Sequence, residues 1–212
     1  MQRKQRNLFI LGTISLAVGL FAILGVIQTK NYLNTTATSQ DIKGSQETPP
    51  SIGGAFQLVD KDGKVWKDTD FMGKPLLVYF GYSYCPDICP TALSHLTQAV
   101  EELGGGKVIQ PIFITLDPER DTPENLHAYS QNFHKDFLML TGSKLQIDQA
   151  TKAYRVHAAR ATEDKEAEDY LVDHSSLIYL MDKNGSYIAH FNHQTPPEEM
   201  VKRVRLHIES GT

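Results

Sequence analysis

The amino-acid sequence predicts an α/β protein in which helices cover both faces of a mixed β-sheet. A nearly all-apolar run at residues 75–80 and a largely apolar run at 108–117 are typical of central strands, because a strand buried on both faces has no polar side. Apolar residues at helical spacing follow each run. Near the C-terminus, two further runs flank residues 182–185, whose Asn-Gly step indicates a β-hairpin.

The expected elements can be placed along the chain in order. They are strands at 54–60, 64–67 and 75–80, a helix that ends before the glycines 104–106, a strand at 108–117, a helix that starts at 121–124, a strand at 137–140, a helix around 147–154, strands at 175–181 and 186–191, and a helix at 198–209. Apolar residues three and four apart from Leu93 to Leu103 place the first helix. A capping residue followed by proline starts the second. This order is the plan of a thioredoxin-like fold.

The composition is that of a folded globular protein, with 41% hydrophobic and 22% charged residues. Three of the 21 Lys and Arg residues lie before position 8, so the remaining 18 face 25 Asp and Glu residues. This excess of acid argues against a nucleic-acid partner, because phosphate binding needs clustered basic side chains.

The first 27 residues read as a cytoplasmic tip followed by a membrane anchor. Residues 8–27 contain no charge, and a helix of this length rises about 30 Å, enough to cross the hydrocarbon core. The preceding Arg3, Lys4 and Arg6 predict that the tip stays in the cytoplasm and that the rest of the chain is extracytoplasmic. We expect a bacterial inner-membrane protein that faces the periplasm. A cleaved signal peptide is the alternative, although the apolar run exceeds the usual length of a signal core.

Residues 28–50 are polar and end in two prolines, which is typical of a flexible linker. A coil of this length has a root-mean-square reach of about 25 Å. The sequence therefore predicts a single folded domain at 51–212 that is held near the bilayer and can turn toward a membrane-embedded partner.

Cys85 and Cys89 are the only cysteines, and they follow the strand predicted at 75–80. A strand-to-helix turn at the carboxyl end of a central strand is where open α/β sheets bind ligands, and a helix start lowers the pKa of a thiol. Residues four apart in a helix have Cα atoms roughly 6 Å apart, so the two sulfurs can hold one metal ion or form a disulfide. A purely structural bridge would add little stability, because so short a ring removes little chain entropy.

Two thiolates leave a metal site open, and soft sulfur selects Cu(I), with imidazole as a compatible partner. His174 stands just before the strand predicted at 175–181, in the region that faces the strand-to-helix turn of a thioredoxin-type fold, and is the candidate third ligand. The other histidines fit ordinary positions on helix faces, at helix ends or around the last strand: His95, His127, His134, His157, His190, His193 and His207.

Several segments resemble the Sco/SenC family of copper proteins in their order and spacing. They are YFGYSYCPDICP at 79–90, LDPERDTPENLHAYSQNF at 116–133, FLMLTG at 137–142, AYRV at 153–156 and EDYLVDHSSLIYLMDKNGSYIAHF at 168–191. The resemblance spans roughly residues 51–208. It implies a membrane-tethered thioredoxin-like domain that binds copper through Cys85, Cys89 and His174, as Cu(I) or as Cu(II) with an added ligand.

The same resemblance implies a role in assembling the dinuclear copper centre of cytochrome c oxidase. The partners would be the copper-bearing subunit of the oxidase and an upstream thiol reductant or copper donor. The alternative is an enzyme, a thiol-disulfide reductase in which Cys85 and Cys89 are the redox pair and copper is incidental. A simple dithiol reductase has no need of His174, and neither has a thiol peroxidase, the third interpretation.

Acidic residues near the motifs have both functional and structural interpretations. Asp87 and Asp173 are the acids closest in sequence to the candidate ligands, and each could orient His174 or contact a docking partner. Helix capping, for Asp87, or solvent exposure is the structural alternative. Residues 117–121, a charged run after the second central strand, are interpreted as loop and cap structure.

Overall fold

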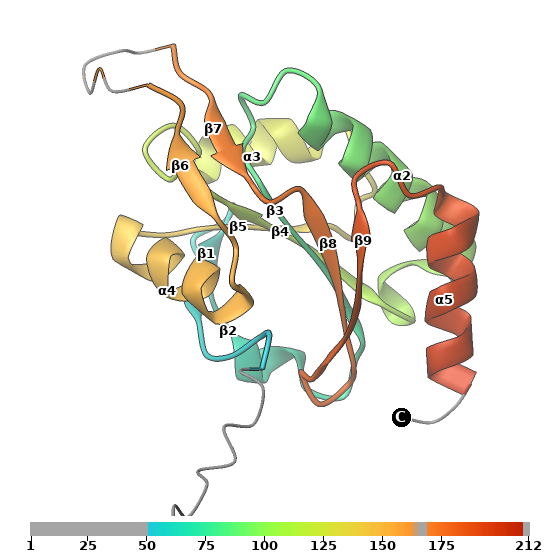
Figure 1. Ribbon diagram of the computed structural model, residues 1–212. Coiled ribbons are helices and arrows are strands. Elements are labelled where there is room, and N and C mark those ends of the chain that lie inside the picture. Colours follow the sequence, from blue (N-terminus) through green and yellow to red (C-terminus); the bar gives the residue numbers. More distant parts are fainter. Residues whose placement is uncertain (1–50, 163, 165–168, 210–212) are drawn as a thin grey trace, which may run out of the picture. The chain divides into compact units, whose positions relative to one another are not determined.

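The computed structural model describes residues 51–162, 164 and 169–209 (Figure 1). The strands are β1 (Gln57–Asp60), β2 (Val65–Lys67), β3 (Leu76–Gly81), β4 (Gln110–Thr115), β5 (Leu138–Thr141), β6 (Ala158–Arg160), β7 (Val172–His174), β8 (Leu177–Met181) and β9 (Tyr187–Asn192). The helices are α2 (Ile88–Leu103), α3 (Pro123–Ser130), α4 (Lys144–Tyr154) and α5 (Pro197–Glu209), with short 3-10 turns η1 (Asp68–Phe71) and η2 (Gly105–Lys107).

Seven strands form one mixed sheet in the order β2-β1-β5-β4-β3-β8-β9. The pairs β3–β4 and β4–β5 are parallel, and the pairs β3–β8 and β8–β9 are antiparallel. All six residues of β3 are buried, as expected for a strand with a neighbour on each side and a covered face above and below. The predicted mixed sheet with a central strand at 75–80 is thus confirmed.

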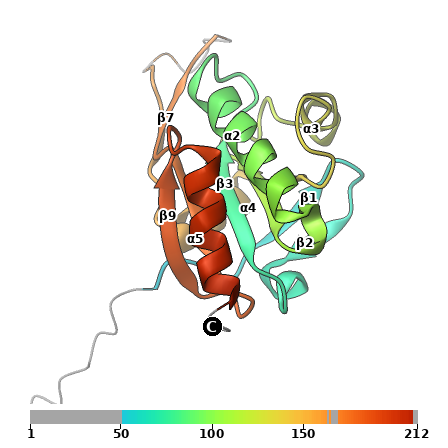
Figure 2. The same ribbon diagram turned by 90° about the vertical axis from the view of Figure 1, so that its right-hand side faces the viewer.

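Helices cover both faces of this sheet, which confirms the predicted α/β class. Figure 2 shows α2 and α5 together in front of the sheet and α4 behind it. Successive side chains of β3 point to opposite faces. Tyr79 reaches Cys89 of α2, whereas the ring of Phe80 packs against Tyr154 of α4, with ring centroids 5.2 Å apart.

Helix boundaries follow local chemistry that the sequence shows. Gly104 ends α2 in the left-handed region, at φ +101°, where a side chain would be strained. Pro123 occupies the first turn of α3. The hydroxyl of Thr122 accepts a hydrogen bond from the N–H of Asn125, so Thr122 caps this helix. Asp121 is not the cap and has another role, described below.

The region before β8 differs from the expectation. The strand predicted at 175–181 is β8, and two further strands, β6 and β7, lie between α4 and β8, where the sequence predicted none. Strands β6 and β7 pair with each other in a separate two-stranded sheet, visible beyond the end of the main sheet in Figure 1. Strands of three residues are too short to show an alternating pattern, so the sequence could not reveal this hairpin.

No helix among the described residues is long and apolar enough to cross a membrane. The anchor predicted at 8–27 and the linker predicted at 28–50 lie outside the described residues.

The core beneath the site can be tested with two leucines. Leu96 of α2 is fully buried, whereas Leu145 of α4 is 70% exposed. Leu96→Ala should lower the free energy of unfolding by about 2–5 kcal/mol through lost transfer energy and a residual cavity. Leu145→Ala, the same atom deletion on the surface, should change it by less than about 0.5 kcal/mol. Urea unfolding of both variants checks this, and equal losses would contradict the described core.

Candidate metal and thiol site

The site begins where β3 ends. After Gly81 the chain turns through residues 82–87, and α2 starts at Ile88. Cys85 lies in the turn and Cys89 in the first turn of the helix, as the sequence predicted. A Cβ at Gly81 would stand 2.8 Å from the Cys89 sulfur, so only glycine lets α2 pack this closely on the strand end.

Both cysteines are free thiols. The N–H of Cys89 donates to the Sγ of Cys85 at 3.4 Å. Cys85 is 8% exposed and Cys89 is fully buried. The hydroxyl of Tyr79, on β3, donates to the Sγ of Cys89 at 3.5 Å. A tyrosine beside the buried sulfur was not foreseen, because an apolar strand gives no sign of which hydroxyl meets a distant thiol.

The environment separates the pKa values of the two thiols. Hydrogen bonds from the Cys89 thiol and from the N–H groups of Cys89 and Asp87 stabilise the thiolate of Cys85 against burial, and they hold its pKa far below the ordinary value. The pKa of Cys89 is raised, because its thiol donates to Cys85 and because it is buried. Near neutral pH the pair therefore holds one negative charge, on the more accessible sulfur.

His174 reaches this pair from the end of β7. Its Nε2 lies 3.7 Å from the Sγ of Cys89, although 85 positions separate the two residues in sequence. The rings of Tyr79 and Tyr82 meet the imidazole edge-on, with centroid distances of 6.4 and 6.0 Å. The Nδ1 of His174 lies 3.3 Å from the carbonyl oxygen of Ser175, a contact that favours a proton on Nδ1 and leaves Nε2 able to accept or coordinate.

The separation of Cys89 and His174 suits two ligands of one ion. With metal bonds of about 2.3 Å to sulfur and about 2.0 Å to nitrogen, ligands at a trigonal angle stand about 3.7 Å apart. The Cys89–His174 distance of 3.7 Å matches this value. No group of three or more His, Cys, Asp and Glu side chains in the described part of the chain is arranged to hold a metal ion. Copper would therefore require Cys85 to complete the set by a local adjustment.

Neither nearby acid holds the imidazole. Asp87 occupies the N-cap position of α2 without a side-chain capping bond, and both Asp87 and Asp173 are exposed. In the described residues, no hydrogen bond joins either carboxylate to His174. The carbonyl oxygen of Ser175 is the polar group beside Nδ1.

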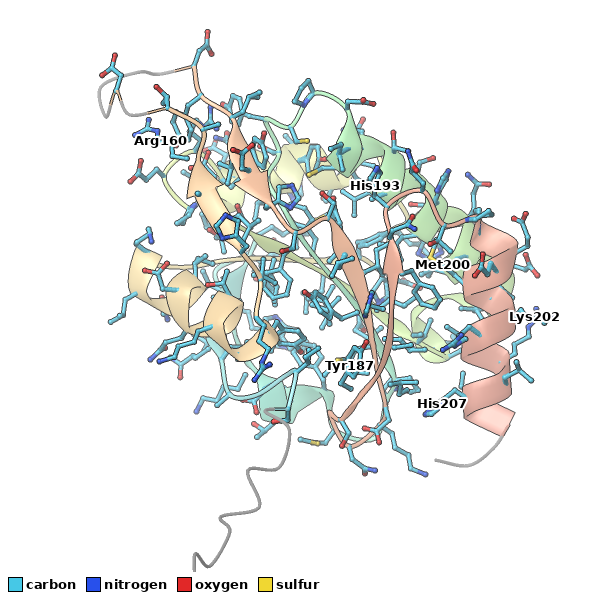
Figure 3. All side chains as sticks on the ribbon, viewed as in Figure 1. Arg160, Tyr187, His193, Met200, Lys202 and His207 are labelled. Carbon is cyan, nitrogen blue, oxygen red and sulfur yellow. The ribbon has the colours of Figure 1, made fainter. Side chains whose placement is uncertain are left out.

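Other histidines lie in different surroundings. The Nε2 of His134 lies 3.0 Å from a carboxylate oxygen of Glu101, and the Nδ1 of His95 is buried without a hydrogen-bond partner. Figure 3 shows His207 near the end of α5, away from the strand ends that carry the site. These observations agree with the sequence interpretation that set His174 apart.

The charged loop 116–122 holds a residue whose importance the sequence did not reveal. Asp121 is fully buried and accepts hydrogen bonds from the N–H and hydroxyl of Ser83 and from the hydroxyl of Thr115, the last at 2.6 Å. Burial raises the pKa of Asp121, while these hydrogen bonds oppose the rise. Because Ser83 is two positions before Cys85, this carboxylate holds the turn that carries the first thiol.

A family model and a curated relative both match most of this chain. The SCO1/SenC family model matches residues 44–209. An SCO2-like protein of Rickettsia prowazekii is 41% identical over 179 residues, which cover 84% of this chain and 86% of the relative.

Solved structures are similar as well. ScoI of Bradyrhizobium japonicum with copper bound is 38% identical at a TM-score of 0.68, covering 73% of this chain and 98% of its own. Yeast Sco1 with copper bound is 38% identical at 0.71, covering 76% and 90%. BsSco, a member of the Sco family of cytochrome c oxidase assembly proteins with a disulfide switch, is 26% identical at 0.59, covering 75% and 95%.

The separated pKa values predict the alkylation behaviour of the reduced protein. Cys85 should react with iodoacetamide at a rate that is nearly constant between pH 6 and pH 8, because it is already a thiolate at pH 6. An ordinary thiol, with a pKa near 8.5, gains about tenfold per pH unit in that range. Cys89→Ala removes the strongest hydrogen bond to Cys85 and should make the rate rise with pH, whereas Cys89→Ser, which keeps a donor, should change the profile less. Mass spectrometry of quenched samples measures the rate, and an ordinary profile for Cys85 in the unsubstituted protein would contradict the described hydrogen bonds.

Proposed function

This chain belongs to the SCO1/SenC family, and we propose that it is a copper-binding protein that delivers copper to the dinuclear copper site of cytochrome c oxidase. In this proposal the ligands are Cys85, Cys89 and His174, and the copper-bearing subunit of the oxidase is the recipient. The observation that carries the proposal is the approach of the His174 Nε2 to the Cys89 sulfur at 3.7 Å.

Chemistry and relatives both support copper as the cargo. Thiolate and imidazole together suit Cu(I), whereas Mg²⁺ and Ca²⁺ prefer oxygen. The ScoI protein of Bradyrhizobium japonicum and yeast Sco1, each 38% identical to this chain, have been solved with copper bound. BsSco belongs to a family of cytochrome c oxidase assembly proteins, which supports the oxidase as the destination.

The protonation states of the three ligands determine how copper affinity depends on pH. Cys85 enters as a thiolate, whereas Cys89 must lose a proton before its sulfur can bond to the ion. The Nε2 of His174 must carry no proton. Copper binding therefore releases a proton from Cys89, and affinity rises with pH until that proton is gone. Release to a recipient proceeds by ligand exchange, starting from the more accessible sulfur of Cys85.

Redox state decides whether the site can load. A disulfide between Cys85 and Cys89 removes both thiolates, so the oxidised protein lacks its sulfur ligands. A thiol reductant upstream must keep the pair reduced where disulfides persist.

We propose that residues 8–27 anchor the chain in the inner membrane and that residues 28–50 link this anchor to the domain on the periplasmic side. The apolar composition of the first segment and the polar composition of the second support this arrangement.

A second function, thiol-disulfide reduction, is favoured by the unequal thiols. The Cys85 thiolate would attack one sulfur of a partner disulfide and expel the other as a thiolate. Cys89 would then lose its proton and attack Cys85, which releases the partner's second thiolate and leaves the Cys85–Cys89 disulfide. Two electrons pass to the partner, and the upstream reductant restores the pair.

Single substitutions should reveal the three copper ligands. Cys85→Ser, Cys89→Ser and His174→Ala should each lower the Cu(I) affinity of the reduced protein by more than about a hundredfold, because loss of a ligand should exceed the 10–100-fold effect of its outer partners. Competition with a Cu(I) chelator under anaerobic conditions measures the affinity. His127→Ala, on an exposed face of α3, is the matched control and should leave it unchanged. Unaltered affinity in His174→Ala would overturn the ligand assignment.

His174→Ala also separates the two functions. The variant should retain reduction of a model disulfide such as oxidised glutathione within about threefold, because both thiols remain, yet it should fail to restore oxidase activity in a strain that lacks the protein. Cys85→Ser should lose both activities. Full restoration of the oxidase by His174→Ala would favour the reductase over copper delivery.

A further inference from the structure

The strand that carries His174 is not part of the main sheet. β7 pairs with β6 alone among the described strands, in the register Ala158–His174, Ala159–Asp173 and Arg160–Val172. A two-stranded hairpin is marginally stable by itself. The placement of the imidazole beside Cys89 therefore needs ties between this hairpin and the rest of the domain.

Tyr170, four positions before His174, supplies such ties. Its hydroxyl donates to the Oδ1 of Asp117 at 2.7 Å, and its carbonyl oxygen accepts from the guanidinium of Arg120 at 2.9 Å. Its ring lies between two arginines, with Cζ of Arg120 at 3.6 Å and Cζ of Arg160 at 3.5 Å from the ring centre. Arg120 in turn pairs with Asp117, in an ion pair of low exposure. Charge-assisted bonds of this kind are strong and directional.

Arg120 also faces the cysteine side of the site. Its Cζ lies 4.7 Å from the ring centre of Tyr84, the residue just before Cys85, and 5.9 Å from that of Tyr82. Within the same loop, Asp121 holds Ser83 through both the N–H and the hydroxyl. The loop thus touches the turn of Cys85 with one set of side chains and the segment of His174 with another.

The loop is itself well braced. The N–H of Asp121 donates to the carbonyl oxygen of Asp117 at 2.8 Å, and the side-chain amide of Asn125 donates to the carbonyl oxygen of Arg120 at 2.6 Å. The N–H of Leu116 donates to the carbonyl oxygen of Gly81 at 2.7 Å, which joins the loop to the end of β3. A loop held in this way can fix the position of the His174 segment relative to the turn that carries Cys85.

We infer that Arg120 and Asp117, acting through Tyr170, are positioning residues that set the distance between His174 and the cysteine pair. This inference rests on the proposed copper-binding function and extends it to the charged loop 116–122, to which the sequence assigned only a structural role. None of the three residues is a copper ligand in this assignment. Asp117 and Tyr170 act on copper through His174, whereas Arg120 also contacts Tyr84, next to Cys85.

Tyr170→Phe tests the inference most directly. It removes the hydroxyl that meets Asp117 and keeps the ring between the two arginines. We expect the Cu(I) affinity of the reduced full chain to fall about tenfold, at the lower end of the effect of residues that hold a metal ligand. In a His174→Ala background the same substitution should have no further effect on affinity, because the group that it positions is gone. This double-mutant cycle distinguishes positioning of His174 from a general loss of structure.

Tyr187→Phe is the matched control. It deletes the same atom and breaks a hydrogen bond of 2.6 Å, to the Nδ1 of His190. Tyr187 pairs with Met181, which pairs with Leu76 at the start of β3, the end of the sheet opposite the site. Figure 3 accordingly shows Tyr187 and Arg160 at well-separated positions. Tyr187→Phe should leave copper affinity unchanged in both backgrounds.

Arg120→Lys provides a second variant that keeps the positive charge but loses the planar guanidinium. It should lower affinity at least as much as Tyr170→Phe, and part of the loss should remain in the His174→Ala background, because Arg120 also contacts Tyr84 beside Cys85. Unfolding by urea shows whether each variant is folded during the copper titration. A Tyr170→Phe variant with unchanged affinity, or with an equal loss in the His174→Ala background, would overturn the inference. Failure of the unsubstituted reduced protein to bind Cu(I) would instead overturn the proposed function.

Discussion

The site depends on bringing an imidazole and a buried thiol together from two distant parts of the chain. The 3.7 Å between the His174 Nε2 and the Cys89 sulfur joins the start of α2 to the end of β7. Cys89 is placed by the main sheet, since Gly81 leaves room for its sulfur at the end of β3. His174 is placed by a hairpin outside that sheet. The chemistry of the protein therefore depends on how firmly the hairpin is held against the domain.

Burial gives the two sulfurs different tasks. Cys89 is fully enclosed between α2 and β3 with the hydroxyl of Tyr79 beside it, so it keeps its proton until a ligand replaces that proton. Cys85 lies in the turn, accepts hydrogen bonds at its sulfur and carries the negative charge of the thiolate. The same asymmetry suits capture of a soft cation and attack on a disulfide, because both reactions begin with an accessible thiolate. In the proposed function, His174 is the residue that distinguishes a copper site from a plain dithiol.

The charged loop 116–122 links these features. A buried carboxylate is tolerated only when hydrogen bonds satisfy it, and Asp121 receives them from Ser83 and Thr115. Asp117 and Arg120 are paired with each other and with Tyr170. Polar groups in such a position hold backbone segments in one arrangement, because breaking any one bond leaves a partner unsatisfied in a poorly hydrated place. The loop stands between the two halves of the site and contacts both.

Local patterns in the sequence predicted most of the elements: the central strand at 75–80 from its apolar run, the end of α2 from Gly104, the start of α3 from Pro123, and the location of the cysteine pair after a buried strand. These features depend on residues close in sequence, so periodicity and capping chemistry are enough to identify them. The tertiary structure alone decided that 172–174 pairs with 158–160, that Asp121 is buried rather than a helix cap, and that Ser175, not Asp173 or Asp87, meets the ring of His174. Strands of three residues are too short to show an alternating pattern. The sequence around a charged side chain also does not indicate whether that side chain faces water or a distant hydroxyl. Such contacts arise only when remote segments pack together, which is the physical reason that the sequence could name His174 as a candidate but could not show what holds it in place.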